Sequence, residues 1–507
     1  MFVVNAVYTL ISLVLAVYLC NALVLLLMFV VGHLRRRRCQ QLRPEWLAAE
    51  WPKVTVQLPV YNEAHVISRL ICGACNLDYA PNRLQIQVVD DSTDETTAFA
   101  AQLVKQYQAR GHDIELVHRA HRTGFKGGAL REALKTATGQ FIAIFDADFV
   151  PPRNFLQSLL PYFQHEPRLG MVQSRWGHLN REYSANTRAQ AMGVDAHFTV
   201  EQTARSTGGL FMNFNGSGGV WRKECILDAG NWQDDTLCED LDLSFRAQLR
   251  DWRFLYVPEV VSPAELPAQV AAFKRQQFRW AKGSLQCALK LWKGVIQAPV
   301  SLFKRLSALL HLTGYLMHVL LVVGLIILVP LLFWDVRPVH VLAIFAGPTI
   351  VHPSMLVASQ AALYPDWKRR MVFMPILVLL CTGLAVNSML AVWEAVTHSN
   401  PTFLRTPKFD LNGRQGKWQT SRYVLPLDKT LVLELCLGGY ALLGVLVAWQ
   451  RGNLGAAFFV GIYAASFLYV AFAQIGQSLR RAHAPFGSVW QALLHPRTTT
   501  LDHECHE

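Results

Sequence analysis

At 507 residues the chain has room for a soluble domain and a bundle of membrane helices. Hydrophobic residues make up 52% of it, charged residues only 17%, and the mean hydropathy is +0.21; these values are high for a purely soluble enzyme and low for an all-membrane protein. The net charge of +12 includes basic runs beside apolar segments (Arg35–Arg38, Lys368–Arg370, Arg480–Arg481), which favours contact with a lipid bilayer and argues against nucleic acid, for which no motif is present.

The first apolar segment runs from Val7 to Val31 and exceeds the roughly 20 residues that a membrane crossing needs. It is too long for the apolar region of a signal peptide and lacks a small-residue cleavage site. Four arginines follow directly. We therefore predict a transmembrane helix over residues 1–34, with the N-terminus outside and the chain from Arg35 onward in the cytosol.

Residues 50–262 read as alternating strands and helices. The alternation predicts an open parallel sheet flanked by helices. In such folds, ligands bind beyond the carboxyl ends of the strands. The four expected strands are Val54–Leu58, Gln85–Val89, Ile114–His118 and Phe141–Phe145.

Acidic residues follow two of these strands. Asp90 and Asp91 come after the second strand, and Asp146 and Asp148 come after the fourth. An Asp-x-Asp turn offers oxygen ligands to a hard divalent ion and leaves coordination sites for diphosphate oxygens. Helix N-capping is the alternative, and it suits Ser92 and the residue after it. For the Asp146–Asp148 pair, which follows an unbroken apolar strand, we favour a metal site.

Two further polar motifs lie in the same region. Lys126 sits in the Gly-rich turn Thr123–Ala129, whose exposed amides suit a phosphate, although a plain loop-to-helix connection explains it equally well. Glu239 and Asp240 open a later helical segment, where a carboxylate could take a proton from an acceptor hydroxyl. Their alternative is an N-cap or a surface acidic patch.

Gln276 to Trp280 lies where the polar region gives way to the membrane region. It combines an amide, the cation Arg279 and an indole, which suit phosphate and a sugar ring or lipid surface respectively. Cations and aromatics interleave with apolar residues from Val261 to Val300, which predicts interfacial helices over residues 263–300.

The remaining chain is dominated by apolar runs. Leu306–Trp334 and Val339–Tyr364 read as two spans. Met371–Val396 is a third run, but the basic stretches on both of its sides belong in the cytosol, so we predict transmembrane and re-entrant helices over 301–397. The alternative is that Lys368–Arg370 faces outward. A cytosolic loop (398–426), a transmembrane hairpin (427–481) and a cytosolic tail (482–507) complete the expected order.

The motifs occur in the order that characterises one family. Asp90-Asp91-Ser92, Asp146-Ala-Asp148, Glu239-Asp240 and Gln276-x-x-Arg279-Trp280, followed by membrane helices, resemble the processive, cellulose-synthase-like glycosyltransferases of family 2. The sequence is most similar to the glucomannan and xyloglucan-backbone synthase branch and its bacterial relatives. The resemblance implies an α/β GT-A (Rossmann-like) cytosolic domain inserted between transmembrane α-helices.

The resemblance also implies roles for individual residues. Cys238 departs from the family pattern, since it replaces the usual Thr before Glu239, which puts any hydroxyl hydrogen bond there in doubt. Phe403-x-x-Thr406-x-Lys408 resembles a gating loop, with a juxtamembrane basic loop as the alternative. The implied assignments are nucleotide-sugar binding by Asp90, Asp91, Lys126, Asp146, Gln276 and Arg279; Mg²⁺ or Mn²⁺ binding by Asp146 and Asp148; catalysis by Asp240 as the base with Glu239; acceptor binding by Trp280; and gating by Phe403, Thr406 and Lys408.

The family resemblance implies inverting transfer of a hexose from UDP-glucose or GDP-mannose to a growing β-linked glycan, of β-1,4 type, with translocation across the membrane. The alternative is a non-processive synthase that glycosylates ceramide or diacylglycerol. The expected location is the plasma (inner) membrane in a bacterium and the Golgi in a eukaryote. The implied partners are the donor, a glycan or lipid acceptor and the bilayer; the motifs neither require nor exclude an accessory protein.

Overall fold

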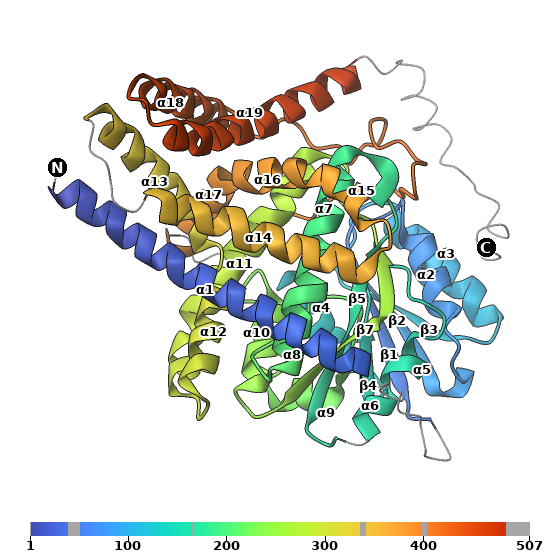
Figure 1. Ribbon diagram of the computed structural model, residues 1–507. Helices are drawn as coiled ribbons and strands as arrows, with labels where there is room; N and C mark the ends of the chain where they lie inside the picture. Colours follow the sequence, from blue (N-terminus) through green and yellow to red (C-terminus); the bar gives the residue numbers. More distant parts are fainter. Residues whose placement is uncertain (1, 39–50, 165, 335–340, 398–402, 483–507) are drawn as a thin grey trace.

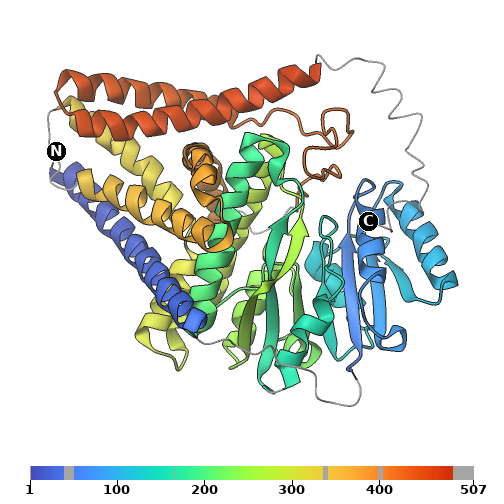
Figure 2. The same ribbon diagram turned by 45° about the vertical axis from the view of Figure 1, so that its right-hand side comes forward.

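The region of alternating strands and helices folds around a seven-stranded sheet, and the apolar segments form a helical bundle beside it (Figures 1 and 2). The computed structural model describes residues 2–38, 51–164, 166–334, 341–397 and 403–482. The predicted tail beyond Ala482 lies outside the described residues. The strands are β1 (Val54–Val60), β2 (Leu84–Asp90), β3 (Asp113–His118), β4 (Phe141–Ile144), β5 (Leu169–His178), β6 (Gly219–Arg222) and β7 (Arg253–Ala264).

The strand order is β3-β2-β1-β4-β6-β5-β7. The four predicted strands form the parallel half, in which β1 pairs with both β2 and β4, and β2 pairs with β3. The expectation of a wholly parallel sheet is wrong, because β6 is antiparallel to both β4 and β5. The result is the mixed sheet of a GT-A-like fold, with the carboxyl ends of β1, β2 and β4 meeting at one edge.

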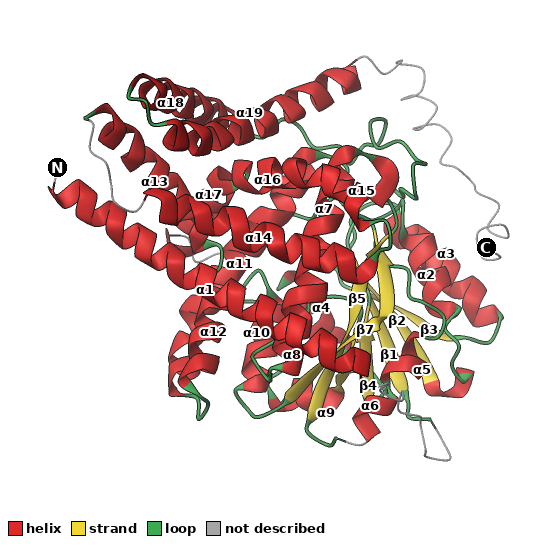
Figure 3. Cartoon of the chain, in the orientation of Figure 1, coloured by secondary structure: helices red, strands yellow, loops and turns green. Residues whose placement is uncertain are grey.

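Both faces of the sheet are covered (Figure 3), so all of β2 and β4 is buried, including Gln85 and Gln87, which alternate with apolar residues in β2. Thr55 and Gln57 of β1 are buried as well and donate hydrogen bonds to the side chains of Gln85 and Gln87. One core cluster packs alternate strand residues such as Val56 and Ile86 against Leu70 and Val104 of two helices, and a second packs Ile144 on the other face. The helices of this region are α2 (Ile67–Cys75), α3 (Thr96–Ala109), α4 (Phe125–Ala133), α5 (Phe155–Leu159), α6 (Pro161–Gln164), α7 (Ala185–Ala196), α8 (Thr203–Thr207), α9 (Lys223–Asp228) and α10 (Glu239–Gln248).

The apolar segments form long helices that gather on one side of the sheet domain (Figure 2). Among the residues that the structure describes, five helical stretches are long and apolar enough to cross a membrane, and a sixth apolar helix, Ile350–Leu363, is shorter. The five are Val3–Leu34, Leu316–Phe333, Trp367–Thr397, Leu431–Gln450 and Leu454–Arg481. The helices are α1 (Phe2–Arg38), α11 (Val270–Gln297), α12 (Leu302–Leu312), α13 (Leu316–Phe333), α14 (Val341–Leu363), α15 (Trp367–Arg370), α16 (Met374–Gly383), α17 (Ala385–Thr397), α18 (Leu431–Gln450) and α19 (Leu454–Ala482).

Three helix boundaries differ from those expected. The amphipathic helix starts at Val270 rather than Val261, since β7 continues to Ala264. The expected span from Leu306 is divided around Gly314, so only α13 has the length and composition of a crossing. The segment predicted as re-entrant is divided at Leu384, and Gly383 packs so closely on α19 that a Cβ there would lie 2.4 Å from Val470 Cγ2. Whether this segment crosses the membrane stays a prediction.

Candidate active site

A pocket opens where β1, β2 and β4 end, between the sheet and α11. It holds about 1050 Å³ of space including its opening to solvent. Every residue that the sequence placed in the site lines it except Asp90. The predicted residues that line the pocket are Asp91, Lys126, Asp146, Asp148, Glu239, Asp240, Gln276, Arg279, Trp280, Phe403, Thr406 and Lys408.

Asp90 is turned into the protein. Its carboxylate is fully buried and accepts hydrogen bonds from the Ser92 amide (3.0 Å) and the Thr97 hydroxyl (2.6 Å), and it contacts His118 Nδ1 at 2.9 Å. These partners belong to the chain's own loops. Asp90 therefore shapes the turn after β2, and Asp91 is the member of the pair that reaches the pocket.

Asp91 is held by a two-pronged ion pair. Arg119 donates to its two oxygens from Nε (2.7 Å) and Nη2 (2.5 Å). The same guanidinium donates to the carbonyls of Thr123 and Phe125 at 2.9 and 3.0 Å. Arg119 thus fixes the end of β2 against the Gly-rich turn that begins α4.

Lys126 reaches from α4 to the first aspartate of the Asp-x-Asp turn. Its Nζ lies 2.5 Å from Asp146 Oδ1 and 3.7 Å from Glu239 Oε1, and it donates to the Gly216 carbonyl at 2.8 Å. Burial alone would lower the pKa of the ammonium, but the Asp146 and Glu239 carboxylates outweigh burial and raise that pKa above its usual value. Lys126 therefore stays protonated in the pocket and is available to a phosphate.

The second aspartate, Asp148, pairs with a lysine from a distant part of the chain. Lys408 Nζ lies 2.6 Å from Asp148 Oδ2 and donates to the Glu265 carbonyl at 2.9 Å. Both carboxylates after β4 are thus neutralised by ammonium groups, which shows that this edge of the sheet attracts cations. A divalent ion fits the two oxygen donors.

The chain supplies few ligands for such an ion. Within the described ranges, no group of three or more His, Cys, Asp or Glu side chains could hold a metal on its own. Asp146 and Asp148 would therefore have to share the ion with oxygens from a ligand, as Mg²⁺ commonly does with phosphates.

Asp240 begins α10 at the back of the pocket. Its Oδ1 accepts the Leu241 amide at 2.8 Å. Burial, and then the negative charge of Glu239, raise the pKa of Asp240 to about 7, even though Lys126 and Arg279 act to lower it. Gly216 lies against this carboxylate with φ +86, and a Cβ there would lie 2.9 Å from Asp240 Oδ2. A backbone turn without a side chain is therefore required to leave Asp240 room.

α11 forms the wall of the pocket on the side of the bundle and contributes Gln276, Arg279 and Trp280. The Arg279 guanidinium lies 4.6 Å from the centre of the Phe403 ring, and its buried Nε has no hydrogen-bond acceptor in the described part of the chain. An unsatisfied buried donor facing a pocket is costly unless a ligand completes it. Cys238 Sγ, at the family's Thr position, lies 3.9 Å from the Arg279 carbonyl, a weak contact in place of a hydroxyl bond.

The loop of residues 403–430 folds over the opening of the pocket. Phe403 stacks on Phe125 with ring centres 5.8 Å apart, and Arg405 pairs with Glu63 at 3.1 Å. Burial raises the pKa of Glu63 to about 8 despite the nearby cations of Arg405 and Lys408. The structure therefore brings Phe403, Thr406 and Lys408 to the site.

Three charged pocket residues were missed by the sequence analysis: Arg122, Arg405 and Glu63. The Arg122 guanidinium lies 3.5 Å from the centre of the Tyr61 ring, beside the Gly-rich turn. The turn-like end of β1 and the basic residues flanking recognised motifs are the signals that could have found them.

The chain resembles known proteins in the region that builds this pocket. Residues 52–283 match the family described as Glycosyltransferase like family 2. A probable glucomannan 4-beta-mannosyltransferase from Oryza sativa subsp. japonica is 42% identical over 261 residues, 50% of this chain and 45% of the relative. A glucomannan 4-beta-mannosyltransferase from Cyamopsis tetragonoloba is 36% identical over 313 residues, 58% of this chain and 60% of the relative.

A solved structure of a mannosyltransferase from Pyrobaculum calidifontis, in complex with GDP-Man and Mn²⁺, aligns with a TM-score of 0.49 and 20% identity, over 78% of this chain and 99% of that one. The chain spans about half the length of the curated relatives it matches. Residues 52–283, which build the pocket, thus match a family 2 glycosyltransferase model, in agreement with the family expected from the motifs.

Proposed function

We propose that the protein is an inverting glycosyltransferase that moves a hexose from a nucleotide sugar to a β-linked glycan at the membrane. One observation carries the proposal: Asp240, a half-buried carboxylate whose pKa is raised to about 7, shares one pocket with the Asp146–Asp148 pair and with Arg279. A base that titrates near neutral pH, next to groups suited to a diphosphate, is what glycosyl transfer without a covalent intermediate needs.

The donor occupies the edge of the sheet in this proposal. Asp91, fixed by Arg119, faces the nucleoside, and Lys126 and Arg279 face the diphosphate. Asp146 and Asp148 hold a Mg²⁺ or Mn²⁺ ion, which when bound supplies positive charge to the diphosphate oxygens. Lys408 and Thr406 close over the donor from the 403–430 loop.

Asp240 accepts the proton from the acceptor hydroxyl as that oxygen forms a bond to the anomeric carbon of the donor. The bond from this carbon to the diphosphate breaks in the same displacement, so the configuration inverts. The departing diphosphate gains negative charge, which Lys126 and Arg279 stabilise as preorganised cations. Trp280, beside Arg279 on α11, provides a flat apolar surface for the acceptor sugar.

The relatives favour mannose as the transferred sugar. The curated relatives are named glucomannan 4-beta-mannosyltransferases and are 36–42% identical over the matched regions. We therefore place GDP-mannose before UDP-glucose as the donor and a β-1,4-linked glycan as the product. The membrane-length helices next to the pocket support a site that works at the bilayer, with the catalytic domain in the cytosol and the glycan passing across the membrane.

The test is the identity of the product. Full-length protein in nanodiscs is incubated with radiolabelled GDP-mannose or UDP-glucose, Mn²⁺ and short mannan or glucan primers. The product is then separated by size and digested with β-mannanase or β-glucanase. Labelled chains that β-mannanase degrades support the proposal; a single-sugar glycolipid as the sole product contradicts the glycan acceptor, and no transfer from either donor contradicts the activity.

A further inference from the structure

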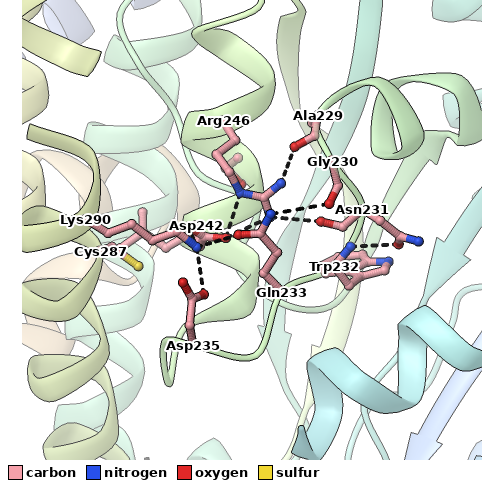
Figure 4. A network of polar contacts seen from close by, with 12 residues as sticks. Ala229, Gly230, Asn231, Trp232, Gln233, Asp235, Asp242, Arg246, Cys287 and Lys290 are labelled. Atoms are coloured by element: carbon pink, nitrogen blue, oxygen red, sulfur yellow. Dashed lines mark hydrogen bonds and ion pairs between the residues drawn. The ribbon is translucent and has the colours of Figure 1, made fainter. Parts of the chain in front are cut away.

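A second buried aspartate lies two residues beyond Asp240, on the side of α10 that faces away from the pocket. The Asp242 side chain is fully buried, and it does not line the site. A buried carboxylate is tolerated only where cations and hydrogen bonds compensate it. Asp242 meets two cations: Arg246 Nη2 at 2.7 Å from its own helix, and Lys290 Nζ at 2.9 Å from α11 (Figure 4).

Both cations also hold the loop of residues 229–238, which joins α9 to α10 and leads directly into Glu239 and Asp240. Arg246 donates to the carbonyls of Ala229 and, at 2.9 Å, Asn231, at the start of the loop. Lys290 contacts Gln233 Oε1 at 2.6 Å and Asp235 Oδ1 at 2.7 Å, in its middle. Figure 4 shows Arg246 and Lys290 meeting at Asp242, with Arg246 in contact with the start of the loop and Lys290 with its middle.

The end of the same loop lies along α11. Gln286 Oε1 accepts the Leu237 amide at 2.9 Å, and Cys287 Sγ lies 3.6 Å from the Cys238 carbonyl. Gly283 allows the close approach, because a Cβ there would lie 2.4 Å from Cys238 Sγ. These contacts form one stripe of the helix, which continues from Arg279 in the pocket to Lys290.

We infer that Lys290, acting through Asp242, is a positioning residue for the transfer reaction. It fixes the 229–238 loop on α11. This keeps the base Asp240, on α10, in a constant position relative to Arg279 and Trp280 on α11. The inference rests on the proposed function. Lys290 has three oxygen partners, two in the 229–238 loop and one on α10, and its side chain is 23% exposed. Without the Lys290 ammonium group, Asp242 keeps Arg246 as its cation, and Gln233 and Asp235 lose their contact with α11.

The test compares Lys290→Met with Lys290→Arg, and with Lys293→Met as a matched control one turn away on the exposed face of α11. We expect kcat to fall roughly tenfold to a hundredfold in Lys290→Met, since a displacement of about 1 Å at a reacting group has effects of this size. Donor KM and nucleotide affinity stay near wild type, because Asp91, Lys126 and Asp146 lie on other elements and α11, which carries Arg279, remains helical. Lys290→Arg recovers much of kcat, and Lys293→Met resembles wild type.

Amide hydrogen exchange of residues 233–241 without substrate is measured on the same proteins. Exchange faster than wild type in Lys290→Met, and not in Lys293→Met, supports the inference. Wild-type kcat in folded Lys290→Met overturns it, as does an equal loss of kcat in Lys293→Met. If wild-type protein transfers no sugar, the proposed function fails, and unchanged exchange in Lys290→Met separately overturns the positioning role.

Discussion

Burial and the negative charge of Glu239 raise the pKa of Asp240, whereas the cations Lys126 and Arg279 lower it. Burial has the largest effect, and the pKa is about 7. The carboxylate accepts a proton only when deprotonated. We therefore expect kcat/KM to rise with pH and level off above about 7, since kcat/KM reports the free enzyme. In Glu239→Gln the neighbouring negative charge is lost, the pKa of Asp240 falls, and the acid limb moves to lower pH.

The measurement is a pH–rate profile of kcat/KM for wild type and Glu239→Gln, each normalised to its own plateau. Glu224→Gln, the same change at an exposed position of α9, serves as the control and should leave the limb in place. If the acid limb of the kcat/KM profile stays at the same pH in Glu239→Gln, the limb reports the ionisation of a group other than Asp240.

Replacing the base itself separates chemistry from binding. Asp240→Asn keeps the shape of the side chain but cannot take a proton at neutral pH. We expect the transfer rate to fall roughly 10²- to 10⁴-fold, while the affinity for the nucleoside diphosphate, measured by calorimetry, stays near wild type. Asp251→Asn, at an exposed turn after α10, is the matched control. Near-normal turnover in Asp240→Asn would remove its role as base.

The sequence motifs assigned both Asp90 and Asp91 to the nucleotide sugar, although strand geometry allows only one of them to face it. Successive side chains of a strand point to opposite sides, so only one of two neighbouring aspartates at the end of β2 can face the ligand edge. Arg122 and Glu63 could not have been found in this way, because their place in the pocket depends on long-range pairing with residues such as Phe403 and Arg405.

The 403–430 loop places a lysine where a metal would bind. Lys408 pairs with Asp148 at 2.6 Å, so a divalent ion must displace the ammonium group. We expect Lys408→Met to bind Mn²⁺ more tightly than wild type in the absence of nucleotide, by roughly tenfold, which corresponds to ~1.4 kcal/mol. Electron paramagnetic resonance of free Mn²⁺ measures the affinity directly.

Lys417→Met changes an exposed lysine of the same loop and should leave Mn²⁺ affinity unchanged. Weaker binding in Lys408→Met would show that Lys408 supports the ion rather than competing with it. Equal tightening in both variants would reduce the effect to a general change in net charge.

Among the elements, the sequence revealed the parallel half of the sheet and missed the other half. Apolar residues recur at every second position of β1 and β2 and fill β4, which makes these strands visible. β6 has only four residues, and β7 contains Pro258 and Pro263, which count against a strand, and pairs with β5 through an irregular register. These strands are stabilised by neighbours that local pattern does not reveal.

At the scale of the whole molecule, α11 connects the pocket to the helical bundle through a buried polar node. Lys274 Nζ lies 2.6 Å from Glu434 Oε1 on α18, and both side chains are fully buried. Gln474 of α19 donates to Glu434 at 3.0 Å, and Asn387 of α17 donates to the Lys274 carbonyl at 3.0 Å. Four helices therefore meet at one ion pair, whose Lys274 lies two residues before Gln276 on α11.

Removing one partner of this pair leaves an uncompensated buried charge. We expect Glu434→Leu to lower the free energy of unfolding by ~3–5 kcal/mol, the cost typical of breaking a buried ion pair. The double change Lys274→Met with Glu434→Leu removes both charges, so much of the stability should return. Thermal unfolding in detergent measures both, with Lys429→Met, at an exposed position nearby, as the control. If the double variant is no more stable than Glu434→Leu, the stability is lost through packing rather than charge. The ion pair between Lys274 and Glu434 then does not stabilise the contact between α11 and α18.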